Sequence, residues 1–239
     1  MTGICGIGKN MSFSDAAAGE SGNGLNADWR NITGYKTTSG TAAAKKKTAA
    51  SNETVYAFYD ALGDNNIYCI QVFDQTKVKD ADNDMIYMTE NLSYDATVNS
   101  SIATEIGKML NAFRKYRSIT PYYLNENLAR CAQDYCGTIT ADKRASRNAD
   151  SLLDILFENY NVDPWNWGEA CYTDAADAIS FANSLIELDD FYEILVNKKQ
   201  VLDPDTGGKI TPTWSYAGVG MASNGKHTYV TVDYVDAVS

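Results

Sequence analysis

Histidine is almost missing from this sequence: His227 is the single histidine among 239 residues. Basic residues are also few, since 20 Lys and Arg stand against 31 Asp and Glu, giving a formal net charge of −11. A chain this acidic lacks the basic face that phosphates need, so we expect no nucleic-acid partner. With one histidine, we find no Ser/His or Cys/His arrangement that could activate a nucleophile.

Long hydrophobic runs are missing too. No apolar stretch approaches the roughly 18 residues of a membrane span, so we expect no transmembrane segment. The first residues, M-T-G-I-C-G-I-G-K, contain no basic start followed by a long apolar run, so we expect no signal peptide. The five cysteines are an odd number without paired spacing, which favours free thiols in a reducing compartment. These absences together predict a cytoplasmic protein.

The charge that is present is unevenly distributed. Residues 1–50 contain six Lys or Arg and three Asp or Glu, a net charge of +3, so the remainder carries −11 − 3 = −14. Residues 1–54 are rich in Gly, Ala, Ser, Thr and Lys without a sustained period, which predicts an extended, low-complexity basic arm. We expect this arm to dock on an acidic partner, with Trp29 and Tyr35 as anchors and Lys45, Lys46 and Lys47 supplying the charge.

Two aromatic and β-branched runs, Val55–Leu62 and Ile67–Phe73, are joined by G-D-N-N and predict a β-hairpin. An isolated hairpin is only marginally stable, so residues 55–99 should form an extension that packs on a main domain over residues 100–239. A second hairpin is predicted from Trp214–Ser223 and Thr228–Asp236 around Asn224.

Between the hairpins the hydrophobic period becomes helical. We predict helices from Ser100 to before Pro121, from the N-cap Asn125 onward, from Ser151 to Tyr160, after the cap Asp174, and over residues 189–197. The order of hairpin, helices and hairpin predicts an α+β fold in which helices cover an antiparallel sheet.

Five motifs follow one another between Ser100 and Asp236. They are L-N-A-F-R (Leu110–Arg114), the segment Pro121–Cys136, W-G-E-A (Trp167–Ala170), the segment Phe181–Leu195, and G-V-G (Gly218–Gly220) followed by Tyr229–Tyr234. Their order and spacing resemble the CAP superfamily, the fold of cysteine-rich secretory proteins, antigen 5 and pathogenesis-related proteins. The resemblance implies a CAP-like α-β-α sandwich.

The chain departs from this family at its cleft. Many members hold two His and two Glu around a central cleft where a divalent metal can bind. Aligned on the motifs, Glu169 retains one glutamate, Ser184 replaces the other, Asp190 replaces one histidine, and no histidine is found near residues 144–147. Glu169 with Asp190 would make a poor zinc site, because zinc prefers His and Cys ligands. We therefore predict a vestigial cleft without catalytic residues, cofactor or metal.

The leading hypothesis is a non-enzymatic, intracellular CAP-like domain that acts as a structural or binding module in a larger protein assembly. A cytoskeletal partner with an acidic surface, such as the tubulin of microtubules, would suit the basic arm. The first alternative is a binding protein for lipids, sterols or other small apolar ligands, which an uncharged apolar cleft would favour. The second alternative, a metal-dependent hydrolase, is disfavoured by the missing histidines.

Overall fold

The computed structural model describes residues 30–31, 44–50, 53–74, 78–80, 86–88, 94–138, 149–173, 177–203, 205–224 and 227–238. The chain divides into two compact units. Unit 1 consists of Met1–Glu90 with Glu187–Asp189, and unit 2 consists of Asn91–Ile186 with Asp190–Ser239. Each unit has its own four-stranded sheet.

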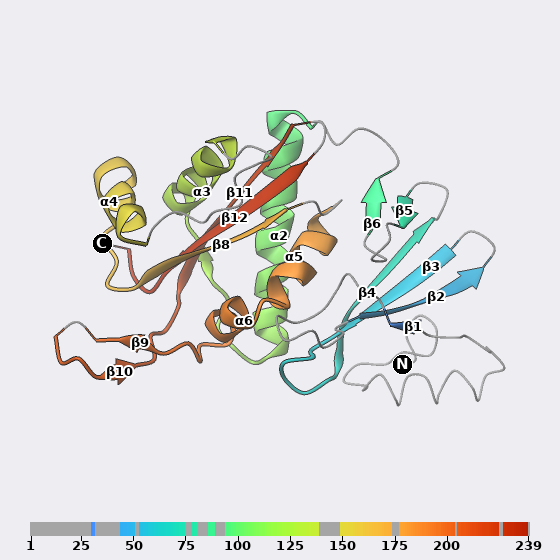
Figure 1. The fold of residues 1–239 in the computed structure, drawn as a ribbon, viewed down its shortest axis with the longest axis horizontal. Helices are drawn as coiled ribbons and strands as arrows, with labels where there is room; N and C mark the ends of the chain where they lie inside the picture. Colours follow the sequence, from blue (N-terminus) through green and yellow to red (C-terminus); the bar gives the residue numbers. More distant parts are fainter. Residues whose placement is uncertain are drawn as a thin grey trace. The chain divides into compact units, whose positions relative to one another are not determined.

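Unit 1 contains an antiparallel sheet of four strands in the order β1-β2-β3-β4 (Figure 1). The strands are β1 (Arg30–Asn31), β2 (Ala44–Ala50), β3 (Glu53–Tyr59) and β4 (Ile67–Asp74), and a separate pair joins β5 (Val78–Asp80) to β6 (Ile86–Met88). The predicted first hairpin is confirmed as β3 and β4. Its first strand ends at Tyr59 rather than Leu62, because the Asp60 carbonyl accepts hydrogen bonds from the Gly63 and Asn65 amides and closes the turn.

The predicted arm over residues 1–54 needs a correction. Strand β2 pairs with β3 along its length, with Lys46 opposite Tyr56, and β1 pairs with β2. Lys45, Lys46 and Lys47 therefore stand in a sheet, and the expected boundary at residue 54 falls inside β3. Side-chain periodicity did not reveal β2, because a strand is held by main-chain hydrogen bonds to a neighbour and here covers the open edge of β3. Trp29 and Tyr35 lie outside the described residues.

Unit 2 is built on a mixed sheet in the order β7-β11-β12-β8, whose three long strands lie side by side in Figure 1. Its strands are β7 (Tyr123–Leu124), β11 (Tyr216–Ser223), β12 (Thr228–Val235) and β8 (Trp167–Thr173), and a small separate hairpin joins β9 (Val201–Leu202) to β10 (Lys209–Ile210). The predicted second hairpin is confirmed as β11 and β12, which pair antiparallel with Val219 opposite Val232. Strand β8 was not predicted, and the short β7 runs parallel to β11.

Five helices lie in the described residues: α2 (Ala96–Tyr116), α3 (Glu126–Thr138), α4 (Ala149–Tyr160), α5 (Ala178–Ile186) and α6 (Asp189–Leu195). The predicted cap of α3 is confirmed, since the Asn125 Oδ1 accepts hydrogen bonds from the amides of the second and third helical residues. Helix α2 begins before Ser100, because the carboxylate of Asp95 caps it. The first turn of α5 is capped by Asp177, whose carboxylate accepts a hydrogen bond from the Ser180 amide. The predicted cap, Asp174, lies outside the described residues. No described helix combines the length and the apolar character that crossing a bilayer requires.

Two glycines on β11 bring α3 against one face of the sheet. A Cβ at Gly218 would lie 2.5 Å from the Leu128 Cβ, and a Cβ at Gly220 would lie 2.5 Å from the Ala132 carbonyl oxygen. Alternate residues of a strand point to opposite faces, so Val219 points the other way, toward Gly107 of α2.

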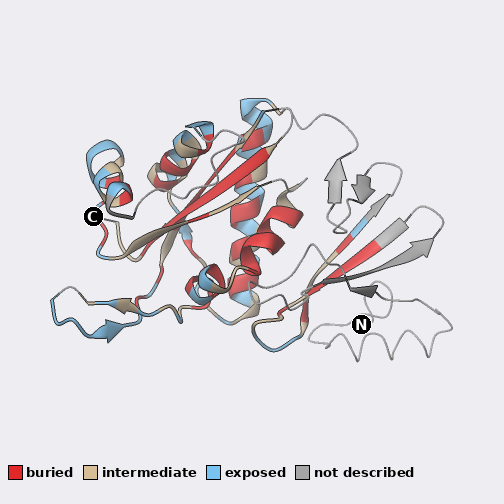
Figure 2. Cartoon of the chain, in the orientation of Figure 1, coloured by how far each residue is buried: buried red, intermediate tan, exposed pale blue. Residues whose placement is uncertain are grey.

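The two faces of the unit 2 sheet are therefore covered by different helices. Helix α4 packs on α3, whereas α5 packs on α2, and α6 places Phe191 against Tyr234 with ring centroids 5.7 Å apart. In Figure 2 the outward faces of α2 and α3 are exposed while their inward faces and β12 are buried. The α+β class and the α-β-α sandwich predicted from the sequence are thus present in unit 2.

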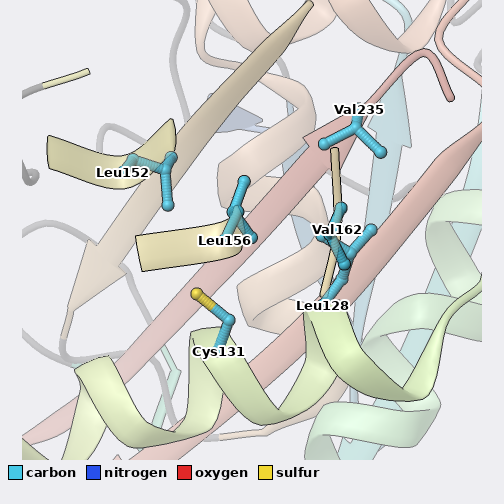
Figure 3. Close-up of a cluster of buried hydrophobic side chains, with 6 residues drawn as sticks. All are labelled: Leu128, Cys131, Leu152, Leu156, Val162 and Val235. Carbon is cyan, nitrogen blue, oxygen red and sulfur yellow. The ribbon is translucent and has the colours of Figure 1, made fainter. Parts of the chain in front are cut away.

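A compact apolar cluster fills the layer between α3, α4 and the sheet (Figure 3). Its buried members come from both helices, from the loop after α4 and from the end of β12: Leu128, Cys131, Leu152, Leu156, Val162 and Val235. This cluster fixes α3 over β11 and β12, and so sets the position of the groove described below.

Candidate functional site

The motif Leu110–Arg114 holds the segment after α2 in place. The Asn111 side-chain amide donates to the Tyr122 carbonyl at 3.0 Å and accepts from the Tyr122 amide at 2.7 Å. Arg114 as a residue is 1% exposed, and its guanidinium donates to the carbonyls of Thr120, Leu195 and Trp214 at 2.7, 2.9 and 2.9 Å. These side chains act as structural ties, because they lead the chain from α2 into β7.

An aromatic ring covers the buried charge of Arg114. The guanidinium carbon lies 3.8 Å from the centroid of the Tyr122 ring. Burial raises the pKa of Tyr122 to about 12, although the guanidinium opposes this shift. The phenol therefore stays protonated at neutral pH and offers no base.

The three predicted cleft residues differ in burial. Glu169 is half-buried on β8, opposite Asp233 of β12. Ser184 is 2% exposed within α5, and its hydroxyl has no hydrogen-bond partner among the described residues. The Asp190 side chain is 90% exposed and forms an ion pair with Lys199. Two of the three lie near one buried phenol, because the pKa of Tyr234 is raised first by burial and then by nearby groups that include Asp190 and Glu169.

The described residues also contain no group of three or more His, Cys, Asp or Glu side chains arranged to hold a metal ion. His227 lies in the turn between β11 and β12, with its ring 6.3 Å from that of Tyr229.

Two thiols meet at one hydroxyl on the face of the sheet that α3 covers. The Cys136 thiol donates to the Thr231 Oγ1 at 3.2 Å, and the Cys171 sulfur lies 3.5 Å from the same oxygen. Burial raises the pKa of Cys136 to about 12, and burial together with Glu169 raises the pKa of Cys171 well above its usual range. A thiol is nucleophilic only as the thiolate, so neither group is prepared for nucleophilic catalysis at neutral pH.

Unit 2 has a groove between α2 and α3 at the edge of β11, with a volume of about 410 Å³. Most of its surface is apolar. Ser100, Ala103 and Gly107 of α2 form one wall, Ala129 of α3 belongs to the other, and Val219 contributes to the floor. The groove exists because these side chains are small, which leaves space between two helices that lie against opposite faces of β11.

The first turns of α3 contribute the charged side chains of the groove. Glu126 and Arg130 stand there four residues apart and carry opposite charges. At this end the Leu124 side chain, which is 40% exposed, lies near Gly107. The groove as a whole is thus electrically balanced and suits an uncharged ligand better than an ion.

No protein-family model and no curated protein matches the sequence. The structure is similar to the crystal structure of an extracellular protein containing a SCP domain from Bacillus anthracis str. Ames, with a TM-score of 0.70, 11% identity, and coverage of 98% of this chain and 74% of the other. It is also similar to a cysteine-rich secretory protein from Staphylococcus aureus subsp. aureus Mu50, with a TM-score of 0.62, 13% identity, and the same coverage of 98% and 74%. The chain has a CAP-superfamily fold.

The motifs that resemble the CAP superfamily mark packing sites in this CAP-like domain. Leu110 and Arg114 are buried in α2, and Trp167–Ala170 lies in β8, where a Cβ at Gly168 would lie 2.6 Å from the Tyr234 hydroxyl oxygen. The resemblance therefore identified the fold, whereas the vestigial cleft of Glu169, Ser184 and Asp190 stays a prediction.

Sequence reasoning missed the groove. The available signal was a stripe of small residues on α2, namely Ala96, Ser100, Ala103 and Gly107, at successive spacings of four, three and four. Such a stripe marks one helix face, but it becomes a wall only when α3 takes its place across the sheet edge.

Proposed function

We propose that this chain is a non-catalytic CAP-like binding domain whose ligand site is the groove between α2 and α3. The observation that carries the proposal is the groove itself, about 410 Å³ in volume and mostly apolar, with opposite charges confined to one region. Concave, largely apolar sites with a few polar groups are the usual form of ligand sites in proteins. An uncharged ligand with apolar groups is the class that such walls favour, because burying a charge there would cost its hydration.

The side chains that could act as a nucleophile or as a general acid or base support a non-catalytic role. The thiols of Cys136 and Cys171 and the phenol of Tyr122 are held protonated by burial. The single histidine is in a turn. General acid–base catalysis favours a group whose pKa lies near the working pH, and these buried acids are shifted away from it.

The test is the binding of an uncharged apolar fluorophore, N-phenyl-1-naphthylamine, to the full chain and to two matched variants. Ser100→Trp places a large ring in the groove, whereas Ser101→Trp places the same ring on the next exposed residue of α2, which does not line it. We expect the wild-type chain and Ser101→Trp to bind the probe equally and Ser100→Trp to bind it at least about tenfold more weakly. Equal binding by all three proteins would show that the groove is not the site.

The alternative that the domain binds a lipid or a sterol uses the same groove. Its supporting observation is again the apolar wall, which would accept an acyl chain or a ring system by burial of apolar surface. Displacement of the fluorophore by cholesterol or by methyl palmitate from the wild-type chain and from Ser101→Trp would favour this alternative.

A second candidate function is docking on an acidic protein partner through residues 1–54. It is supported by the net charge of +3 in residues 1–50 against −14 in the rest of the chain. Tubulin in microtubules is one such partner. Because β2 belongs to the sheet of unit 1, deleting residues 1–54 would disturb the fold as well as any docking. Replacing Lys45, Lys46 and Lys47 with Gln keeps the strand, and cosedimentation of this variant with microtubules at low salt tests the proposal. Unchanged cosedimentation would count against a role of these lysines.

The compartment is a separate proposal. The odd number of cysteines favours a reducing, cytoplasmic location, whereas the two similar solved proteins are described as extracellular and secretory. Alkylation of the protein in intact cells, followed by peptide mapping, decides between them. Five alkylated cysteines would support the cytoplasm, and a native disulfide would support an oxidising compartment.

A further inference from the structure

On the outer edge of β11, the main-chain groups of Val219 have no hydrogen-bond partner among the bonds of the described residues. The N–H and C=O groups of alternate residues in a strand point to the same edge. On the edge away from β12, the Ala217 carbonyl accepts from the Asn125 amide. Four residues after Ala217, the Met221 amide donates to the Gln133 Oε1 at 3.1 Å. The Met221 carbonyl accepts from the Gln133 Nε2 at 2.8 Å. The N–H and C=O of Val219 therefore point to this edge between two filled positions.

The Val219 position opens into the groove rather than to bulk water. Val219 is 9% exposed and lines the groove together with Ala217 and Gly218. Buried main-chain groups without a partner are rare, because each one costs about as much as a lost hydrogen bond. The position is left open because β7 ends at Leu124 and the next residue, Asn125, turns the chain into α3.

We propose that an extended peptide segment of a partner protein binds in the groove and pairs with the Val219 main chain. This proposal rests on the binding role of the groove and names its ligand class. The segment would take the place that a longer β7 would occupy, so the new pairing continues an existing one between β7 and β11. Addition of a strand to an open sheet edge is a common form of peptide recognition, with main-chain hydrogen bonds for affinity and side-chain pockets for specificity.

The side chain of Gln133 supports this assignment. Its amide has the same donor and acceptor as a peptide unit, and it already pairs with Met221 as a neighbouring strand would. It also limits the length of the new pairing, because the peptide must leave the edge before Met221. The ligand is therefore a short extended stretch and not a long added strand.

The walls define the side chains of this stretch. Successive residues of an extended peptide point to opposite sides, here toward Ala103 and Gly107 of α2 and toward Ala129 of α3. Ala103, Gly107 and Ala129 carry no charge, so small or medium apolar side chains fit against them and charged ones would lose their hydration.

The test uses amide-resolved NMR of the full chain titrated with the pentapeptide acetyl-Thr-Val-Ala-Val-Thr-amide. A second peptide of the same sequence carries a methyl group on every amide nitrogen, so it keeps the side chains and has no main-chain N–H donor for the Val219 carbonyl. We expect the first peptide to shift the Val219 amide signal and to slow its hydrogen exchange, with a smaller effect at Met221, whose amide is already bonded. We expect the methylated peptide and the Ser100→Trp variant to show binding weaker by at least about tenfold, and Ser101→Trp to match the wild-type chain.

The outcomes separate this proposal from the one before it. If the apolar fluorophore binds in the groove but the pentapeptide does not, or if the methylated peptide binds equally well, the pairing with Val219 is wrong and the groove remains an apolar site. If the peptide binds without changing the Val219 amide, the proposal also fails. If neither the fluorophore nor the peptide binds, the proposed function itself is wrong.

Discussion

Replacing Gly218 with Ala should strongly destabilise unit 2. The added Cβ would lie 2.5 Å from the Leu128 Cβ and closer still to main-chain atoms of Leu128 and Ala129, whereas ordinary contact begins at 3.4 Å. The nearest of these, the Ala129 nitrogen, would be 2.1 Å away, so restoring ordinary contact requires a shift of 3.4 − 2.1 = 1.3 Å, and backbone atoms cannot rotate away as a side chain can. Overpacking of this kind costs about 1–3 kcal/mol, and with main-chain atoms involved we expect about 3 kcal/mol.

The measurement is a urea titration followed by tryptophan fluorescence, because three of the four tryptophans, Trp165, Trp167 and Trp214, lie in unit 2. A loss of about 3 kcal/mol also corresponds to a fall in Tm of roughly 6–12 °C, at roughly 2–4 °C per kcal/mol. The control is Gly137→Ala in α3, where a Cβ would meet nothing within 4 Å.

The control should leave stability unchanged or raise it by up to about 1 kcal/mol, because Ala favours a helix more than Gly does. If the unfolding free energies of Gly218→Ala and Gly137→Ala agreed within about 1 kcal/mol, the close approach of α3 to β11 would be refuted. The groove described here would then lose one of its walls.

Four further predictions concern single groups. Arg114→Met should lower the unfolding free energy by about 3 kcal/mol or more in the same urea titration, because the carbonyls of three buried residues lose their donor. A change below about 1 kcal/mol would contradict these three hydrogen bonds of Arg114. Asn125→Ala should cost about 1 kcal/mol through loss of the α3 cap, and no change would mean that water replaces the cap. Burial raises the pKa of the Cys136 thiol to about 12 in the folded chain, so above about pH 9 this thiol ionises in the unfolded chain but not in the folded one. The unfolding free energy of the wild-type chain should therefore fall by about 1.4 kcal/mol per pH unit relative to that of Cys136→Ala. Parallel pH–stability curves of the two proteins would contradict that burial. The purified protein should show the same melting temperature with and without EDTA, and one bound zinc per chain by elemental analysis would overturn the non-metal proposal.

The sequence by itself determined the elements whose signals are local. The period of 3.6 after Ser100, the amide of Asn125 and the β-branched run at Thr228–Asp236 each predict a structure that neighbouring residues largely settle. The order of motifs from Leu110 to Tyr234 likewise predicted the three-layer fold, because Gly218 and the buried Arg114 are needed wherever those layers meet.

Tertiary structure alone decided what lies between elements. The sequence of β2 has no alternation of polar and apolar side chains, and the segment becomes a strand by pairing with the edge of β3. The cleft suggested by Glu169 and Asp190 could not be judged from the sequence, because burial and direction depend on the packing of distant segments. The groove has the same cause: a stripe of small residues on α2 becomes a binding surface only when β7 stops short and leaves Val219 at an open edge.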